Sequence, residues 1–260
     1  IDLFRSVNKG DSWNQISKWS NNNNLSGLGV SFVHADQHGL AFASSSKMVF
    51  GNDGGVYFTD DAAITIQSRN KNYNTLQFYT VGVAPTTAFD DEEYFIAGAQ
   101  DNGTQLISKA TDGINSSSYA AGGDGAASFF DTDGTDEYLI ANYVYNQSID
   151  LYNFNTANWV EINDEDAAKG DFINQEELDS NLNILYSNYS SGNSFKIKKY
   201  FNLLSTVIKD DLSSPLMDSA PSALKISPYT TESSKLYVGL KNGKVFKVEE
   251  ANISNGTWSE

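Results

Sequence analysis

Apolar and polar residues follow each other in short runs along most of the chain, and the runs recur as one repeating unit. Each unit has an apolar run, a turn rich in Gly, Asp or Asn, and a second apolar run. The first apolar run of the unit occurs five times, roughly every 44 to 52 residues, at 48–50, 95–97, 139–141, 184–186 and 236–238. Short strands repeated at about this spacing are typical of propeller blades. The sequence therefore predicts an all-β fold, a β-propeller of four-stranded antiparallel blades.

The repeat divides residues 1–260 into about five and a half blades of a single, partial propeller. Complete blades are predicted at 28–70, 74–121, 122–163, 170–213 and 220–260. Residues 1–20 resemble the outer two strands of a further blade whose inner strands lie outside this chain. We therefore expect a ring that is incomplete on its N-terminal side and is completed by the rest of a longer chain. Helical periodicity is nearly absent, and only residues 174–182 could form a turn of helix.

The first segment carries a second pattern, because residues 6–13 fit S-x-D-x-G-x-[ST]-W with Asn8 in place of Asp. This pattern resembles the Asp box of the bacterial-neuraminidase-repeat (BNR) propellers. Asn8 and Gly10 suit left-handed turn geometry, and Trp13 is expected to pack between blades. Less regular copies end at Trp159, which is also expected to pack between blades, and at Trp258. The residues expected to act structurally are Ser6, Asn8, Gly10, Trp13, Trp159 and Trp258.

Composition narrows the class of protein. Aromatic residues make up 13% of the chain and charged residues 19%, which suits a β-rich protein. Cysteine is absent, which excludes disulfides and thiolate metal sites. No apolar run approaches the roughly 20 residues of a membrane helix, so membrane insertion is not expected. The net charge of −16 argues against nucleic acid as a partner and favours cations or basic partners.

His34, Asp36 and His38 form the sharpest cluster of candidate functional residues and include both histidines of the chain. In a strand, residues i, i+2 and i+4 share one face, with neighbours about 6.6 to 6.8 Å apart. By blade order this strand is the innermost one, so the cluster is expected to face the central channel or the interface of inner strands. Three interpretations stay open: a buried His–Asp–His hydrogen-bond network, a metal or ligand site, and a catalytic site. A straight strand rarely supplies a complete Zn²⁺ site.

Three acidic glycine-rich loops, at 52–55, 100–103 and 122–125, are further candidates for ligand binding. In adjacent blades their carboxylates, Asp53, Asp101 and Asp124, would lie on one side of the ring. Asp and Asn oxygens there could bind Ca²⁺ or sugar hydroxyls, whereas the alternative is ordinary hairpin-turn chemistry. Residues 131–136 also have the spacing of a Ca²⁺ loop, but they lack the Glu at loop position 12 and fall where a hairpin is expected.

The segments 33–42, 51–57, 99–104 and 122–125 follow, in order, the patterns H-x-D-x-H-a-L, G-N-D-G-G-v-Y, G-x-Q-D-N-G-T and G-G-D-G. This series resembles secreted Asp-box propellers of the sortilin-like or glycosyl-hydrolase-like kind, many of them exported by the type IX route of Bacteroidetes. The resemblance implies a secreted or cell-surface binding or scaffold module with a glycan or protein partner.

The resemblance also implies an alternative function, a glycoside hydrolase of the xyloglucanase-like propeller type that uses paired Asp carboxylates. Those enzymes carry a catalytic Asp in a D-x-G-G-x-Y turn. Here Asn52 stands at that place, Asp53 is shifted by one, and a second matching turn is absent. We therefore assign no catalytic residue from the sequence.

A last motif lies at residues 218–220, Asp-Ser-Ala, which resembles the D-[ST]-apolar acceptor for O-glycosylation in Bacteroidetes. Ser219 is the candidate acceptor. The alternative is a plain loop before Pro221.

Overall fold

The structure is a computed structural model that describes residues 2–260, and its secondary structure is almost entirely β. The described residues form seven sheets, five of which have four antiparallel strands, so the predicted all-β fold of four-stranded blades is confirmed. The chain forms two compact units, residues 1–76 and residues 77–260, which are described separately. Among the described residues, no helix has the length and apolar character needed to cross a membrane.

The first unit contains one four-stranded sheet and a hairpin. The sheet consists of β5 (Gln37–Phe42), β6 (Met48–Asn52), β7 (Gly55–Thr59) and β8 (Gln67–Ser68). The hairpin pairs β1 (Phe4–Arg5) with β2 (Asn14–Gln15), and β3 (Ser17–Lys18) pairs in parallel with β4 (Ser31–Phe32), with the 3₁₀ turn η1 (Asn23–Leu25) between them. Leu3 and Ile16 pack on a core that contains Val33, Phe50 and Tyr57. These apolar contacts attach the hairpin segment to the sheet.

The turn of this hairpin is built by side-chain hydrogen bonds. Ser6 Oγ accepts a hydrogen bond from the Gly10 backbone N–H (2.8 Å), and Asn8 Oδ1 accepts one from the Ser12 N–H (3.0 Å). Lys9 and Gly10 hold the left-handed φ values of 61° and 97°. The expectation that Asn8 adopts this conformation is therefore wrong, because Asn8 contributes through its amide oxygen.

A second turn, after β7, repeats these hydrogen bonds with different residues. Thr59 Oγ1 accepts from the Ala63 N–H (3.0 Å), and Asp61 Oδ1 accepts from the Thr65 N–H (2.9 Å). Hydrogen bonds from the backbone N–H of Thr65 and, to a smaller extent, from its hydroxyl lower the pKa of Asp61 to about 2. Buried Ile66 stands where the first turn has its tryptophan. The turn pattern thus recurs in the first unit without a Trp.

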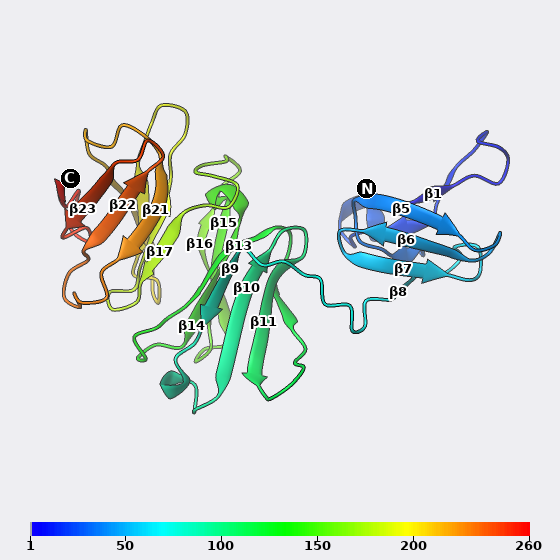
Figure 1. Cartoon of the computed structure of the whole chain (residues 1–260), viewed down its shortest axis with the longest axis horizontal. Helices are drawn as coiled ribbons and strands as arrows, with labels where there is room; N and C mark the ends of the chain where they lie inside the picture. The colour runs from blue at the N-terminus through cyan, green and yellow to red at the C-terminus, as the bar shows by residue number, and fades with distance from the viewer. Residues whose placement is uncertain (1) are drawn as a thin grey trace. The chain divides into compact units, whose positions relative to one another are not determined.

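The second unit consists of four four-stranded sheets that follow one another in chain order (Figure 1). The first sheet contains β9 (Thr80–Val83), β10 (Glu93–Ala99), β11 (Gly103–Ala110) and β12 (Ser118–Ala121), with the 3₁₀ turn η2 (Thr86–Ala88) after β9. The second contains β13 (Gly125–Phe130), β14 (Tyr138–Tyr143), β15 (Ser148–Asn153) and β16 (Asn158–Asp164), with η3 (Val144–Asn146) after β14. The third contains β17 (Glu176–Asp179), β18 (Ile184–Asn188), β19 (Ile197–Phe201) and β20 (Ile208–Leu212), and the fourth β21 (Pro221–Ile226), β22 (Leu236–Leu240), β23 (Val245–Glu249) and β24 (Thr257–Ser259).

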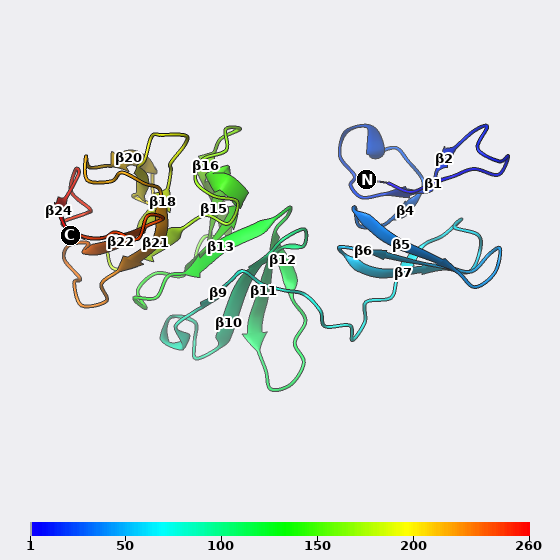
Figure 2. The same cartoon turned by 45° about the horizontal axis from the view of Figure 1, so that its top comes forward.

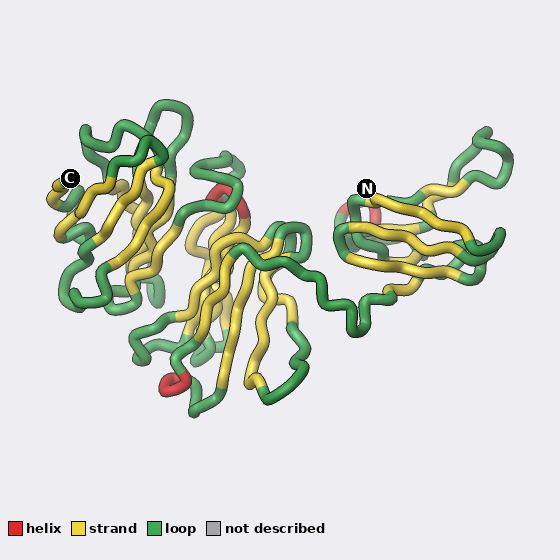
Figure 3. Tube along the Cα trace, in the orientation of Figure 1, coloured by secondary structure: helices red, strands yellow, loops and turns green. Residues whose placement is uncertain are grey.

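Each sheet is an antiparallel meander, so its first strand pairs only with its second and forms one edge of the sheet (Figure 2). β13 packs against β9 and β10, and β17 packs against β21. Figure 3 shows the strands of these four sheets with the loops that join them. The first strands of neighbouring sheets are thereby brought together.

The hydrophobic cores lie between consecutive sheets. Leu139 on β14 packs with Ile96 and Phe130, whereas its neighbour Ile140 packs with Leu151 and Leu185. Successive side chains of a strand point to opposite faces, so β14 is buried on both faces. A strand buried on both faces carries a continuous apolar run, which explains the short apolar runs of the repeat.

Three sequence predictions about individual elements need correction or refinement. Trp13 and Trp159 are 62% and 46% exposed, so the expectation that they pack between blades is wrong. The cores are instead filled by the aliphatic and tyrosine side chains of the strands. Trp258 is partly buried and packs on Phe246, with ring centroids 5.9 Å apart. The possible helix at 174–182 is also wrong, because β17 occupies this segment and places Leu178 against the core.

Candidate functional site

The first strands of all four sheets in residues 77–260 line one cavity of about 750 Å³. Its lining comes from β9, β13, β17 and β21 and from the turns that follow β13, β17 and β21. The lining residues lie at 80–83, 128–130, 132–133, 177–181 and 225–228. Since each of these strands is the edge of its sheet, the cavity is bounded by side chains and by strand edges from four successive blades.

Two acidic residues of β17, Glu177 and Asp179, line this cavity. Glu177 Oε1 lies 2.6 Å from Lys225 Nζ and accepts a hydrogen bond from the Ile226 N–H (3.1 Å). Asp179 is only 1% exposed, and its Oδ2 accepts a hydrogen bond from the Ser234 hydroxyl (2.5 Å). Burial raises the pKa of Asp179, although the hydrogen bond from Ser234 opposes the shift. One strand thus carries an ion-paired carboxylate and a buried carboxyl that retains its proton more strongly than an ordinary aspartate.

The turn after β13 brings two more carboxylates to the edge of the cavity. Asp133 lines the cavity, and its Oδ1 accepts hydrogen bonds from the N–H and the hydroxyl of Thr135, both 2.7 Å long. Although burial opposes it, these bonds lower the pKa of Asp133. Asp131 is fully buried, and burial together with the Asp133 carboxyl raises its pKa to about 7. The Thr132 N–H donates to Ser180 Oγ (3.0 Å), which joins this turn to the next sheet.

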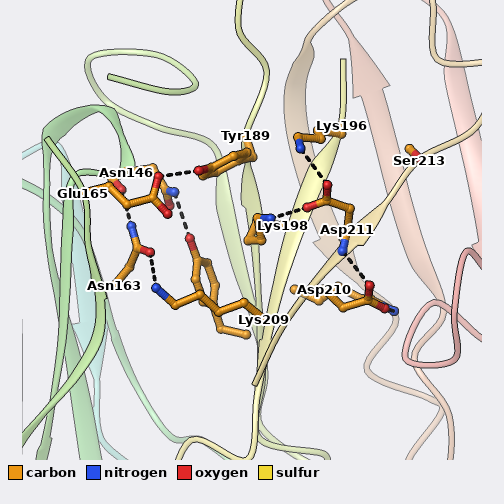
Figure 4. A network of polar contacts seen from close by, with 12 residues as sticks. Asn146, Asn163, Glu165, Tyr189, Lys196, Lys198, Lys209, Asp210, Asp211 and Ser213 are labelled. Carbon is orange, nitrogen blue, oxygen red and sulfur yellow. Dashed lines mark hydrogen bonds and ion pairs between the residues drawn. The ribbon is translucent and has the colours of Figure 1, made fainter. Parts of the chain in front are cut away.

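A buried polar network ties the second and third sheets together away from the cavity (Figure 4). Asn146 Nδ2 donates to the Tyr200 hydroxyl (2.8 Å), and Asn146 Oδ1 lies 2.6 Å from Ser187 Oγ. Lys209 Nζ donates to Asn163 Oδ1 (2.6 Å). These groups use one another as partners, so the network holds the sheets in register and is not a ligand site.

The lysines beside this network also have partners within the protein. Lys196 and Lys198 both pair with Asp211, and their ammonium groups lie 5.1 and 4.5 Å from the centre of the Tyr189 ring. Tyr189 in turn donates a hydrogen bond to Glu165 (Figure 4). With Asp211 between them, the two lysines do not form a free anion site.

The predicted His34, Asp36 and His38 cluster lies in the first unit, where it does not form the expected strand face. β5 begins only at Gln37, and Asp36 has a left-handed φ of 56°. The turn breaks the two-residue alternation, so the prediction of a shared strand face is wrong. Asp36 and His38 are exposed, which also excludes the buried network. His38 pairs with Asp53, and carboxylate oxygens of Asp36 and Asp53 lie within 4.8 Å of each other.

Two of the three acidic glycine loops meet in the second unit. The Asp101 N–H donates to Asp124 Oδ1 (2.9 Å), and Asp124 Oδ2 accepts from the Tyr143 hydroxyl (3.4 Å). Asp101 itself takes a left-handed φ of 60°. Asp124 therefore acts as a turn-stabilising acceptor between two sheets. The loop of Asp53 belongs to the first unit, where the Asn52 side chain accepts from the Gly54 N–H (3.0 Å).

Ser219 lies in the loop before β21. The neighbouring Asp218 accepts hydrogen bonds from Asn242 Nδ2 (2.8 Å) and Lys244 Nζ (2.6 Å). These bonds, led by that from Lys244, lower the pKa of Asp218. The acceptor role of Ser219 stays a prediction.

Sequence reasoning missed the carboxylates that face the cavity. The signal for Glu177 and Asp179 was their spacing of two in the segment Glu-Glu-Leu-Asp, which places both on one face once the segment is a strand. Asp133 carried a visible Ca²⁺-loop spacing, but the buried state of its neighbour Asp131 follows only from the packing of the next sheet.

Neither a scan of models of protein families nor a search of curated proteins finds a match to this chain. Among solved structures, the chain is similar to an ancestral GH74 enzyme, with a TM-score of 0.51 and 14% identity over 99% of this chain. It spans only about a third of that enzyme, 34% of its length. A candidate 6-phosphogluconolactonase from Bacteroides uniformis aligns with a TM-score of 0.48 and 13% identity over 85% of this chain and 68% of its own. The likeness to the GH74 enzyme, together with the repeated four-stranded sheets, identifies the fold as a β-propeller.

Proposed function

We propose that this β-propeller is a binding module that holds a neutral glycan in the cavity of residues 77–260. The observation that carries the proposal is the cavity, whose volume of about 750 Å³ falls in the range of small-molecule sites. Its lining combines carboxylates with the hydroxyls of Thr132, Ser180 and Ser227, which can exchange hydrogen bonds with sugar hydroxyls. Lys225 supplies the cationic side chain of the lining, and this side chain forms an ion pair with Glu177. The lining therefore favours a neutral polyol over a phosphate or sulfate group.

Blocking the cavity tests this proposal. Val81 lines it and is 64% exposed, so Val81→Trp fills space there without displacing core atoms. Val245 on β23, outside the lining, is 59% exposed, and Val245→Trp is the matched control. A panel of neutral oligosaccharides, measured by calorimetry, should include a ligand that Val81→Trp binds at least tenfold more weakly and Val245→Trp binds normally. Unchanged affinity in Val81→Trp, or no binding by the wild type at millimolar sugar, would contradict the proposal.

A second candidate function, glycoside hydrolysis, is favoured by the arrangement of Glu177 and Asp179. The backbone positions of residues i and i+2 in a strand lie about 6.6 to 6.8 Å apart, which places the two carboxyl side chains on one face at the scale of the roughly 6.5 to 9.5 Å between the carboxyls of inverting glycosidases. The raised pKa of Asp179 suits a general acid, and the ion-paired Glu177 suits the base. Because Asp179 is only 1% exposed, this function requires its carboxyl to be uncovered when a glycan binds. The pair replaces the two aspartates that the family resemblance implied.

If the protein is a hydrolase, the wild type releases reducing ends from the glycan that it binds. Asp179→Asn and Glu177→Gln should each lower this rate by a factor of about 10² to 10⁴, the usual contribution of general acid–base catalysis, and should leave binding largely intact. Reducing-end assays on the bound oligosaccharide decide the matter. Binding without any release assigns the protein to the binding class alone.

A further inference from the structure

The hairpin and the sheet of the first unit enclose a second cavity, of about 590 Å³, which is lined mainly by apolar side chains. The sheet register pairs Leu40 with Phe50 and Phe42 with Met48, and alternate residues of a strand share a face, so all four side chains lie on one face of the sheet. Met48 and Phe50 are buried, whereas Leu40 and Phe42 are 53% and 65% exposed. The sheet thus offers the cavity apolar side chains that the first unit leaves partly in water.

The hairpin supplies a further apolar wall of this cavity. Phe4 on β1 is 51% exposed, Val7 in the turn is 77% exposed, and Trp13 before β2 is 62% exposed, and all three line the cavity. Large apolar side chains that gather in one exposed patch mark a binding surface, because a folded chain ordinarily keeps such patches small. An apolar ligand in this cavity would remove apolar surface of the sheet and of the hairpin from water at once.

Arg5, the second residue of β1, places a positive charge in this apolar lining. Its Nη1 donates to the carbonyl oxygen of Ala62, which lies in the turn after β7 with a left-handed φ of 60°. Within the described residues, no carboxylate forms an ion pair with Arg5, and a guanidinium has five N–H donors. The cavity therefore combines apolar walls with a cation that can receive an anionic group.

The charge distribution of the chain also permits an anion here. Residues 1–76 contain six acidic and six basic residues, so the net charge of −16 belongs to residues 77–260. We propose that the cavity of the first unit binds a small apolar carboxylate, with its carboxylate on Arg5 and its apolar body against Trp13 and the sheet. The planar guanidinium matches a carboxylate in geometry, and the volume suits a small molecule. The site lies in another unit than the glycan cavity and goes beyond the function proposed above.

The test is calorimetric titration of the 260-residue chain with phenylbutyrate and with its neutral amide, phenylbutyramide. The wild type should bind the carboxylate at least tenfold more tightly than the amide, because only the carboxylate forms hydrogen bonds with the guanidinium in which both groups are charged. Arg5→Gln should remove this preference. Arg69→Gln, at the other arginine of the chain and outside the cavity lining, is the matched control and should keep the preference.

Ser45→Trp is a second variant, which leaves the hairpin unchanged. Ser45 lines the cavity from the exposed loop between β5 and β6, so an indole there fills the cavity without displacing core atoms. Both probes should then bind at least tenfold more weakly. This variant decides the matter if Arg5→Gln fails to fold.

Three results of the titrations overturn the proposal: no binding of phenylbutyrate to the wild type at millimolar concentration, equal affinities of the wild type for the acid and the amide, or equal losses in Arg5→Gln and Arg69→Gln. A dimer that Ser45→Trp dissociates in sedimentation, with neither probe bound by the wild type, would instead assign this surface to a second copy of the chain. The titrations use no sugar, so their failure is separate from a failure of glycan binding.

Discussion

Gly98→Ala should destabilise the second unit by about 3 kcal/mol, at the upper end of the usual cost of overpacking. A Cβ atom at Gly98 on β10 would lie 2.0 Å from the carbonyl oxygen of Ala126 and 2.8 Å from the carbonyl carbon of Gly125. Both atoms belong to the backbone of β13, so no flexible side chain can move aside. The two sheets would have to separate, which would also disturb the hydrogen bond from Thr80 Oγ1 to Ala126 O (2.8 Å).

The repeat supplies a matched control for this substitution. Gly239 holds the same place in the last repeat, in the second strand of its sheet, but its nearest neighbours would lie 3.6 Å or more from an added Cβ. Gly239→Ala should therefore stay within about 1 kcal/mol of the wild type and can stabilise the strand, since Gly is a poor strand residue. Urea unfolding of both variants measures the difference. Equal stabilities would show that the first and second sheets of the unit do not approach this closely.

The spacing of the blades was predictable because most residues of the repeated apolar runs become buried in the cores. Strands such as β14 and β18 carry apolar residues on both faces, with Leu185 in one core and Tyr186 in the next. In β6 and β22 only one face is buried, since Val49 and Tyr237 are each 41% exposed, but the same short apolar runs occur there. Four of the five predicted complete blade ranges contain one four-stranded sheet, and in the fifth, 122–163, the sheet ends one residue later, at Asp164.

The candidate site was less predictable, because its properties depend on turns and on neighbouring sheets. A single left-handed residue, Asp36, removes the alternation on which the histidine cluster was based. The exposure of Trp13 likewise depends on where its hairpin packs, since Leu3 and Ile16 make the contacts with the sheet. Burial is the main cause of the raised pKa of Asp131. This burial arises only when the third sheet of the second unit covers the turn after β13. Local sequence patterns carry no record of such contacts.

Glu176, the first residue of β17, makes the stability of the second unit depend on pH. Its Oε1 accepts hydrogen bonds from Ser187 Oγ (2.8 Å) and from Asn174 Nδ2 (3.4 Å), but its buried Oε2 has no partner. Burial raises the pKa of this carboxyl from 4.5 to about 7, and the two hydrogen bonds only partly oppose the shift. The folded state therefore holds the proton more tightly than the unfolded state.

From this pKa we expect Glu176 to stabilise the fold fully below pH 4.5 and to lose that stabilisation as the pH rises towards 7. One pKa unit corresponds to about 1.4 kcal/mol, so the loss is about 3 kcal/mol. Asp131 and other acids add their own pH dependence, and the informative quantity is therefore the difference between the wild type and Glu176→Gln, which cannot ionise. Urea unfolding from pH 4.5 to 8 should show Glu176→Gln gaining about 3 kcal/mol on the wild type, whereas Glu232→Gln, at an exposed loop position, should follow the wild-type curve. Parallel curves for Glu176→Gln and the wild type would mean that water reaches Oε2 and that the carboxylate is solvated in the folded state.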